Sequence, residues 1–528
     1  MEQKDNLIGV ESFSKGGADL KKRVFYTLIL IPFLLFYAQP VGAAEKEEDG
    51  WMDEEIYFIM VDRFQNGDQS NDYNVDLSDP RAYHGGDIQG IIDKLDVIED
   101  MGFTSIWLTP IMANEEKGYH GYWIEDFMEV DEHFGTMEDV KRLVREAHDR
   151  DMKVIFDFVV NHTGYKHPWL NDSTKQDWFH EESPIIGESQ EQLENGWLAG
   201  LPDLNQEHPK VRQYLFNAAE FWITETGVDG FRLDTVKHVP KTFWEEFSDH
   251  VTSIDPDFFL LGEVWSENPN YIAEYESIGI DSFVDYPFYE AATTAFQTEG
   301  NSLKELYTVW ERNKAFFEQP HLLGNFLDNH DNKRFTRLAL LNEENPVNRW
   351  KMALTYMYGA PGIPIVYQGS EYAMDGGEDP DNRRMMNFKV GEEEVKQHIE
   401  QLSAIRKEFT ALTEGDFERV VDEGAFAVFK RTHGNESVYI AVNNSEETKT
   451  ATLNDVPEGS QLRGLIYDSI ARSTDGAHKI ALDRSTADLY VVEEDKGINW
   501  LVVIPVVGVM GSFIAFVIYV TRKNRAQT

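Results

Sequence analysis

Short apolar segments alternate with amphipathic stretches between about residue 53 and residue 412, and this alternation limits the fold more than any other feature. The apolar segments are Ile56–Met60, Ser105–Leu108, Val154–Phe158, Gly230–Leu233, Phe259–Gly262, Ser282–Val284, Leu322–Leu327 and Ile363–Tyr367. Helical patterns such as Met137–Arg150 and Val211–Thr226 lie between most of them. The pattern predicts an α/β fold, a parallel (β/α)8 TIM barrel with catalytic side chains at the carboxyl ends of its strands.

Two further segments depart from the barrel pattern. Residues 162–207 follow the third predicted strand, are rich in Gly, Pro, Asn and Trp, and are too long for a simple connection, so they predict an inserted lobe. From residue 413 to 495 the pattern changes to short alternating strands, for instance Ala425–Lys430, Ser437–Val442 and Leu489–Val492. We therefore expect a catalytic barrel over 45–412 and a C-terminal antiparallel β-sandwich domain over 413–495.

The first 44 residues have the pattern of an export signal. Lys21, Lys22 and Arg23 precede a charge-free apolar run over 24–37, and small residues lead up to Ala44. A basic region, an apolar region and a small-residue exit predict a secretory signal peptide over 1–44, with an uncleaved anchor as the alternative.

A second apolar run lies near the C-terminus. Trp500 to Val520 contains no charged residue and would be about 31 Å long as a helix, close to the thickness of a bilayer core. This run predicts a transmembrane helix over 500–520 and, because Arg522, Lys523 and Arg525 follow it, a cytoplasmic tail over 521–528. A buried core helix is the alternative. The prediction places the body on the extracellular face of the cell membrane, with a single-pass C-terminal anchor.

Charge and cysteine content exclude several classes of function. The chain has 94 Asp and Glu residues against 48 Lys and Arg residues, a formal net charge of −46. So acidic a protein would repel a polyanion, which argues against nucleic-acid binding through a basic surface. The absence of cysteine excludes disulfides, thiolate metal sites and a cysteine nucleophile.

Polar side chains cluster just after the predicted strands. Arg232 and Asp234 end the fourth strand, Glu263 follows the fifth, and Asp331 follows the seventh. Because parallel strands of a barrel end at one rim, we expect these three carboxylates to lie together. Glycoside hydrolysis needs such a set: one carboxylate that attacks the sugar and one protonated carboxyl that releases the leaving oxygen.

Four strand-end segments, in this order, resemble the four hallmark regions of the α-amylase superfamily of glycoside hydrolases (glycoside hydrolase family 13). They are Asp157–His162, Gly230–His238, Gly262–Val264 and Leu327–Asp331. Three further segments resemble other motifs of that family: Tyr119–Trp123, Leu201–Asn205 and Gly362–Glu371. The resemblance implies a retaining mechanism with Asp234 as the nucleophile, Glu263 as the general acid/base and Asp331 as a carboxylate that binds sugar hydroxyls.

The resemblance also implies a set of substrate-binding residues. These are His120, Tyr122, Arg232, Lys237, His238 and His330. We expect Arg232 to lower the pKa of Asp234 because both side chains face the same way on one strand. The apolar neighbours of Glu263 are expected to raise its pKa so that it holds a proton.

Calcium is the cofactor that the resemblance implies, because the available ligands are oxygens. Asn161, Asp203 and the backbone carbonyl of His238 match the family's calcium site between barrel and inserted lobe. A second candidate site resembles one found in cyclodextrin glucanotransferases and maltogenic amylases, with a polar loop as the alternative. Its residues are Asn66, Asp68, Asn71, Asp72, Gly85 and Asp87.

These features together predict endo-acting hydrolysis of α-1,4-glucosidic bonds in starch, maltodextrin or related glucans by a membrane-anchored, extracellular α-amylase. Residues 374–383 look more like the neopullulanase and cyclomaltodextrinase branch, so a maltogenic, cyclodextrin- or pullulan-degrading enzyme is the alternative. A catalytically inactive carbohydrate receptor is the non-enzymatic alternative. The sequence does not indicate an oligomeric state.

Overall fold

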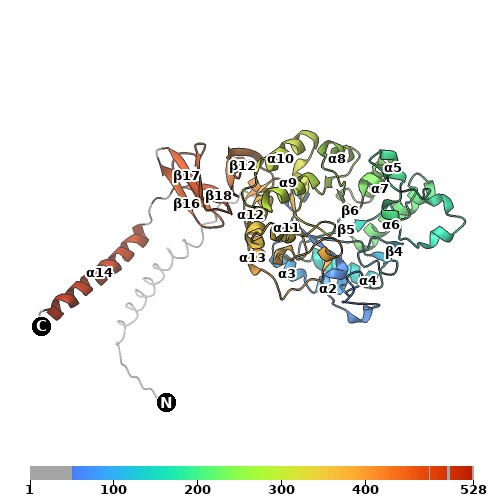
Figure 1. The fold of residues 1–528 in the computed structure, drawn as a ribbon, viewed down its shortest axis with the longest axis horizontal. Helices are drawn as coiled ribbons and strands as arrows, with labels where there is room; N and C mark the ends of the chain where they lie inside the picture. Colours follow the sequence, from blue (N-terminus) through green and yellow to red (C-terminus); the bar gives the residue numbers. More distant parts are fainter. Residues whose placement is uncertain (1–49, 475, 496, 498–499, 526–528) are drawn as a thin grey trace, which may run out of the picture. The chain divides into compact units, whose positions relative to one another are not determined.

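We describe the protein from a computed structural model, which describes residues 50–474, 476–495, 497 and 500–525 (Figure 1). The predicted signal peptide over 1–44 lies outside these residues.

A parallel barrel forms the centre of the structure. Its strands are β1 (Ile56–Ile59), β2 (Ser105–Leu108), β5 (Lys153–Phe158), β6 (Gly230–Leu233), β7 (Phe259–Gly262), β8 (Ser282–Phe283), β9 (Gly324–Asn325) and β10 (Ile363–Tyr367). They are hydrogen-bonded in the order β8-β7-β6-β5-β2-β1-β10-β9, and a parallel bridge between Val284 and Gly324 joins the two ends. The strands are buried along almost their whole length, because side chains fill the barrel and helices cover it, which explains the continuous apolar runs. The predicted (β/α)8 fold is confirmed.

Helices cover the outside of the barrel (Figure 1). They are α2 (Ile88–Ile92), α3 (Leu95–Asp100), α4 (Met137–His148), α6 (Pro209–Thr226), α7 (Lys241–Ile254), α8 (Pro269–Glu276), α9 (Tyr286–Phe296), α10 (Lys304–Phe316), α11 (Phe335–Leu341), α12 (Pro346–Gly359) and α13 (Glu393–Glu408). Local sequence sets their ends. Thr136 and Asp139 form a reciprocal capping box at the start of α4, and Gly227 ends α6 in a left-handed conformation.

Two excursions build the walls above the carboxyl ends of the strands. After β2, the hairpin β3 (Met112–Asn114) and β4 (Ile124–Val130) precedes α4. After β5, the predicted inserted lobe contains α5 (Gln190–Asn195) and several short 3-10 turns. A β-bridge between His162 and Asp203 ties the two ends of this lobe together.

The C-terminal region is an eight-stranded antiparallel sandwich, as predicted. Its strands are β11 (Asp416–Asp422), β12 (Phe426–His433), β13 (Glu436–Asn443), β14 (Lys449–Leu453), β15 (Ser460–Gly464), β16 (Ile470–Thr474), β17 (Ala477–Leu482) and β18 (Thr486–Glu494). It has a small apolar core of its own and packs against α12 through β13 and β18. Arg349 of α12 donates to Asn444 Oδ1 at 2.6 Å across this contact.

The last helix, α14 (Trp500–Arg525), corrects the prediction of a membrane anchor. Across the residues that the structure describes, we find no helix with both the length and the apolar character that crossing a membrane requires. The predicted single-pass C-terminal anchor over 500–520 and the extracellular membrane-anchored localisation are therefore wrong, and the assignment of 521–528 to a cytoplasmic tail stays an untested prediction.

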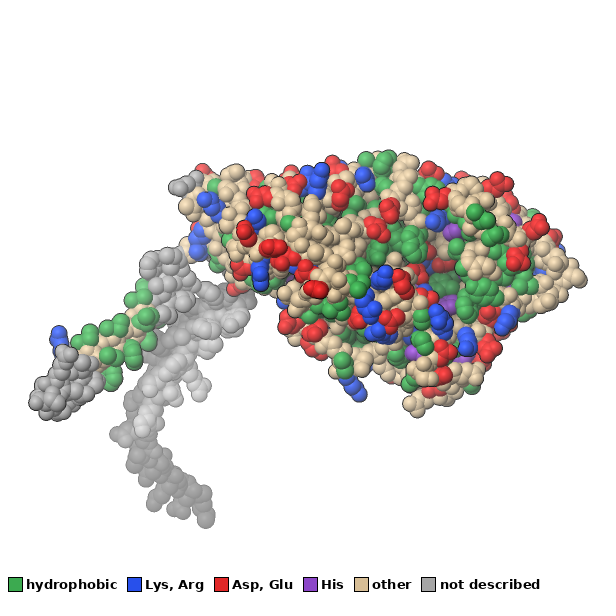
Figure 2. All heavy atoms as spheres, in the orientation of Figure 1, with side chains coloured by type: hydrophobic (Ala, Val, Ile, Leu, Met, Phe, Trp, Pro, Cys, Tyr) green, Lys and Arg blue, Asp and Glu red, His purple; other side chains and the backbone are tan. Residues whose placement is uncertain are grey.

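Acidic side chains are spread over the visible face of the molecule, with basic side chains among them (Figure 2). On this face the carboxylates are therefore distributed and do not gather into one acidic patch.

Candidate active site

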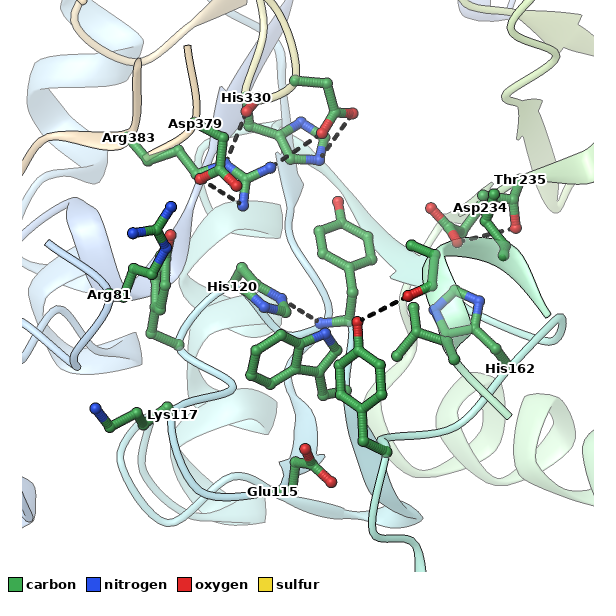
Figure 3. Close-up of a pocket in the computed structure, with 18 of the residues that line it drawn as sticks. Arg81, Glu115, Lys117, His120, His162, Asp234, Thr235, His330, Asp379 and Arg383 are labelled. Atoms are coloured by element: carbon green, nitrogen blue, oxygen red, sulfur yellow. Dashed lines mark hydrogen bonds and ion pairs between the residues drawn. The ribbon is translucent and has the colours of Figure 1, made fainter. Parts of the chain in front are cut away.

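A cleft of about 910 Å³ opens at the carboxyl ends of the barrel strands. It is lined by Asp234, Glu263 and Asp331, which the sequence predicted to lie together. The predicted substrate-binding residues His120, Tyr122, Lys237, His238 and His330 line the same cleft. Figure 3 shows His120, Asp234 and His330 pointing into the cleft from different sides. Arg232, the remaining member of that predicted set, lies below them and is 1% exposed.

Arg232 binds three carboxylates at the base of the cleft. Its Nη1 atom lies 2.9 Å from both carboxylate oxygens of Asp157 and 2.8 Å from Asp234 Oδ1. Its Nη2 atom lies 2.7 Å from Glu263 Oε1. Asp157, Arg232 and Glu263 come from β5, β6 and the end of β7, which are neighbours in the barrel, so strand order alone brings them together. One cation thus holds three acids in a buried cluster.

Burial dominates the electrostatics of this cluster. It raises the pKa of Asp157 to about 6 and raises the pKa of Asp234 well above its usual value. Arg232 opposes both shifts, but burial outweighs it, and repulsion from neighbouring carboxylates adds to the rise at Asp234. The prediction that Arg232 keeps the pKa of Asp234 low is therefore wrong. The setting of Glu263 is also more polar than predicted, because its carboxylate pairs with Arg232. A cluster with more acids than cations retains a proton readily, as acid/base chemistry requires.

Two histidines stand near Tyr122. The Tyr122 hydroxyl donates to Asp157 Oδ2 at 2.8 Å, and its ring stacks on His330 at 5.3 Å. Burial, reinforced by the positive charge of Arg383, lowers the pKa of His120 and of His330 well below the usual value. Both imidazoles are therefore neutral near pH 7 and can exchange hydrogen bonds with sugar hydroxyls without adding charge.

The segment after β10 supports the end of the seventh strand. Arg383 Nη2 lies 3.1 Å from Asp331 Oδ1, and Arg383 Nε donates to the backbone oxygen of His330 at 2.8 Å. Asn382 Nδ2 donates to the same oxygen at 2.7 Å. Figure 3 shows Arg383 and Asp379 beside His330, across the cleft from Asp234. This segment therefore fixes one side of the cleft floor.

Lys237, His238 and Trp265 form the opposite wall. Lys237 Nζ donates to the backbone oxygen of Trp265 at 2.7 Å, and burial lowers the pKa of this lysine. His238 Nδ1 lies 3.0 Å from the backbone oxygen of Leu193 in the inserted lobe. The Trp265 side chain is 48% exposed and stacks on Tyr286. The wall thus presents a cation and an aromatic face to the cleft.

Three oxygen-bearing groups meet between the barrel and the inserted lobe, where the first calcium site was predicted. The side-chain amide of Asn161 lies 3.2 Å from Asp203 Oδ1 and 2.9 Å from the backbone oxygen of His238. With the amide nitrogen in that position, Asn161 donates to both oxygens; with the amide oxygen there, all three atoms are ligands for a hard cation. Asn161 and Asp203 are fully buried. These residues therefore fit a calcium ion.

The structure divides the second predicted calcium set. Asp87 accepts hydrogen bonds from the backbone N–H groups of Gly67, Asp68 and Gly90, and the last of these bonds caps α2. Asp68 caps the short 3-10 turn Gln69–Asn71. The other members lie closer together: Asn66 Nδ2 donates to Asp72 Oδ1 at 2.8 Å, and a Cβ atom on Gly85 would lie 2.7 Å from both atoms. Asn66 and Asn71 each have a buried side-chain oxygen without a hydrogen-bond partner.

No group of three or more His, Cys, Asp or Glu side chains among the described residues is arranged to hold a metal. The oxygen sets above contain asparagines and a backbone carbonyl, so a cation there would depend on those weaker, neutral ligands.

Four residues of the site were missed or left without a role in the sequence analysis. They are Asp157, Trp265, Tyr286 and Arg383. Asp157 begins one of the strand-end segments that resemble the family, and Trp265 directly follows another. Their positions in the sequence therefore indicated that they lie near the site. Tyr286 and Arg383 follow the sixth and eighth strands, and only barrel closure brings them to the carboxylates predicted to be catalytic.

Comparison with known proteins identifies the family. The alpha-amylase catalytic domain profile matches residues 58–420, and an alpha-amylase C-terminal domain profile matches residues 415–490. The Anoxybacillus alpha-amylase structure is 59% identical, with a TM-score of 0.84, over 85% of this chain and all of that one.

Two curated relatives extend the comparison. The beta/alpha-amylase of Paenibacillus polymyxa is 37% identical to this chain over 82% of the chain's length. The matched region spans only 37% of the length of that relative. A cyclomaltodextrinase of Geobacillus thermopakistaniensis is 32% identical over 75% of this chain and 70% of its own length. The chain belongs to the alpha-amylase family of glycoside hydrolases.

Proposed function

We propose that this protein is an endo-acting, retaining α-amylase that hydrolyses α-1,4-glucosidic bonds in starch-like glucans. Asp234 is the nucleophile, Glu263 the general acid/base, and Asp331 the carboxylate that binds sugar hydroxyls. The observation that carries the proposal is the attachment of Asp234 and Glu263 to one guanidinium, that of Arg232. This limits the separation of the two carboxyl groups, and retaining glycosidases place theirs about 5 Å apart.

In the first step, an oxygen of Asp234 bonds to the anomeric carbon while the bond from that carbon to the glycosidic oxygen breaks. The electron pair of the broken bond goes to the leaving oxygen, which takes the proton of Glu263. In the second step, Glu263 removes a proton from water, whose oxygen displaces Asp234. The ion pair with Arg232 supports the role of Asp234, because the guanidinium favours the ionised carboxylate that attacks and opposes the rise in pKa that burial causes.

The remaining cleft residues would bind the glucan. His120, Tyr122 and His330 would contact the sugar at the cleavage point, and Lys237 with His238 would line the side of the leaving chain. The size of the cleft, about 910 Å³, supports binding of several sugar units, as endo action requires. We assign the catalytic unit to residues 45–412, including the lobe over 162–207, and the accessory sandwich to 413–495.

We also propose that Asn161, Asp203 and the backbone oxygen of His238 hold a calcium ion. A bound cation would supply charge that draws the lobe to the barrel, and it would thereby fix the wall that carries His238 and Lys237. Asn66, Asn71 and Asp72 are the ligands of the second proposed site, with Gly85 leaving the space that they need.

A cyclodextrin- or pullulan-degrading activity is the second candidate. The observation that favours it is the packing of residues 374–383 against His330 and Asp331, because this is the segment that resembles the cyclomaltodextrinase branch. The similarity to a cyclomaltodextrinase supports the same reading. An inactive receptor is disfavoured, because all three predicted catalytic carboxylates face one cleft.

The test uses the full chain in calcium buffer with soluble starch, pullulan and β-cyclodextrin in parallel, and follows products over time. A spread of oligosaccharides from starch supports the α-amylase, whereas faster attack on cyclodextrin or pullulan supports the second candidate. Glu263→Gln should lose at least about a hundredfold in turnover, the usual contribution of a general acid. Activity equal to wild type in that variant would refute the assignment of Glu263.

A further inference from the structure

Tyr286 lies at the base of the cleft beside Glu263, and the catalytic scheme above gives it no role. Its hydroxyl donates to Glu263 Oε1 at 3.0 Å, and its side chain is almost completely buried. It follows the sixth strand of the barrel, a segment outside the four that carry the catalytic carboxylates. A buried hydroxyl aimed at a proposed acid/base can affect the chemistry directly.

The position of Tyr286 is fixed by its surroundings. It is the first residue of α9, and the preceding residue, Asp285, caps that helix by accepting from Phe288 N at 2.9 Å. Asp285 is held in turn by Asn313 Nδ2 at 2.6 Å. The Tyr286 ring stacks on Trp265 at 5.1 Å and meets the edge of Phe326 at 5.3 Å. The hydroxyl therefore cannot swing away without disturbing packed aromatic rings.

The hydrogen bonds of Glu263 are distributed unequally between its two oxygens. Oε1 receives both Arg232 Nη2 at 2.7 Å and the Tyr286 hydroxyl at 3.0 Å. Oε2 accepts only the backbone N–H of Thr235, at 3.1 Å, among the contacts described. A carboxylate oxygen has two lone pairs, so Oε1 is saturated and Oε2 keeps one lone pair free.

We propose that Tyr286 is a positioning residue for catalysis: with Arg232 it saturates Glu263 Oε1, so that Oε2 carries the proton that is delivered to the glycosidic oxygen. This inference rests on the proposed role of Glu263. The proton passes from Glu263 Oε2 to the leaving oxygen as the bond to the anomeric carbon breaks and Asp234 forms its new bond to that carbon. The Tyr286 hydroxyl keeps its own proton throughout and acts only by holding Oε1.

Removing the hydroxyl alone separates this role from packing. Tyr286→Phe keeps the ring that supports Trp265 and deletes only the bond to Oε1. Tyr289→Phe is the matched control, because Tyr289 is a neighbouring buried tyrosine of α9 whose ring meets the edge of Tyr286 at 6.4 Å and stacks on Phe326. Glu263→Gln reports on the proposed function itself.

The experiment compares kcat/KM for two substrates with the full chain. Maltoheptaose has a sugar leaving group that needs a proton, whereas the fluoride of α-maltosyl fluoride leaves without general-acid help. Because kcat/KM reports steps up to the first irreversible one, hydrolysis of the glycosyl-enzyme does not enter. For Tyr286→Phe we expect a loss of about tenfold on maltoheptaose, typical of one hydrogen bond to a charged group, and less than about twofold on the fluoride.

If Tyr286→Phe loses kcat/KM equally on both substrates, or loses none on maltoheptaose, the positioning role is overturned. It is also overturned if Tyr289→Phe loses as much kcat/KM on maltoheptaose as Tyr286→Phe does. The two proposals fail differently. If wild type does not cleave maltoheptaose, or Glu263→Gln cleaves it as well as wild type, the proposed function fails. If Glu263→Gln is inactive on maltoheptaose and Tyr286→Phe behaves as wild type, only the role of Tyr286 fails.

Discussion

Arg383 and Asp331 are separated by 52 residues in the chain, and they form an ion pair of 3.1 Å at the edge of the cleft. The pair connects the segment after β10 to the end of the seventh strand, and Arg383 also binds the backbone oxygen of His330. One arginine thereby holds both neighbouring residues of the proposed sugar-binding motif.

Replacing this arginine should weaken substrate binding in the transition state. Arg383→Ala removes the ion pair and one support of the His330 backbone, so Asp331 is no longer held toward the sugar. We expect kcat/KM on maltoheptaose to fall about tenfold or more, since a charge-assisted hydrogen bond contributes about 1.5–3 kcal/mol. Lys333→Ala is the control, because Lys333 is partly exposed and pairs with Glu378 rather than with Asp331. Equal losses in the two variants would contradict the role given to Arg383.

Arg232 should not tolerate exchange for lysine. A lysine ammonium is a single point donor and cannot replace the planar fork that reaches three carboxylates. We expect Arg232→Lys to lower kcat at least about a hundredfold, because Asp157, Asp234 and Glu263 lose their common partner. The measurement is steady-state hydrolysis of starch.

Arg431→Lys provides a comparison for that variant. Arg431 is also fully buried, but its hydrogen bonds go to the backbone oxygens of Gly415, Gly359 and Thr413. The Arg431→Lys substitution should therefore reduce thermal stability, while kcat of the folded variant stays within about twofold of the wild-type value. A loss of kcat as large as that of Arg232→Lys would count against the special role of the carboxylate cluster.

Calcium should stabilise the folded chain through Asn161. A ligand that binds only the folded state at a hundred times its Kd adds about 2.7 kcal/mol to the free energy of unfolding. We expect chelation to lower the thermal midpoint of wild type by a few degrees, and Asn161→Ala to reduce that dependence to the part that the second proposed site contributes. Asn205→Ala, a variant in the same lobe whose amide binds a backbone oxygen, should respond to chelation as wild type does. A midpoint of wild type that is insensitive to calcium would refute the site.

The stability of the protein should fall with rising pH because of Glu371. This fully buried carboxyl has its pKa raised from 4.5 to about 7, chiefly by burial, against the opposing hydrogen bond from the Tyr57 hydroxyl. Between pH 4.5 and 7 the unfolded chain has released this proton while the folded chain retains it. The free energy of unfolding therefore decreases across that window, by about 3 kcal/mol from this group.

Glu371→Gln should remove that contribution. Glutamine does not titrate, so the difference in unfolding free energy between pH 5 and pH 8 should be smaller by about 3 kcal/mol than in wild type. The amide also loses one acceptor toward Gly369 N, a cost that is the same at every pH. Denaturant unfolding at both pH values measures the difference, and Glu408→Gln on the exposed surface of α13 is the control. An unchanged difference in Glu371→Gln would exclude this carboxyl as the source.

The positions of the barrel strands were predictable because strands of a parallel sheet are buried on both faces. The predicted ranges for β2, β6, β7 and β10 coincide with the observed strands. The seventh strand was predicted over Leu322–Leu327, whereas β9 covers only Gly324–Asn325. Apolar character marks burial, and the residues around β9 are buried without being paired in the sheet.

The candidate site was predictable only as far as the strand ends go. Asp234, Glu263 and Asp331 follow three different strands, so barrel topology was enough to bring them to one cleft. The sign of the pKa shift at Asp234 was predicted wrongly, because the sequence shows that an arginine is near but not how completely the pair is buried. The apolar run at the C-terminus likewise predicted a membrane span that the described structure does not contain.

The sequence by itself determined the fold and the chemical class of the site, since hydrophobic periodicity and residue type depend on neighbours along the chain. Tertiary structure alone decided which carboxylates share Arg232, which side chains hold them, and what burial does to their pKa values. The Tyr286 bond to Glu263 and the Arg383 bond to Asp331 span 23 and 52 residues. Such contacts depend on barrel closure and on the depth of burial, which no local pattern in the sequence records.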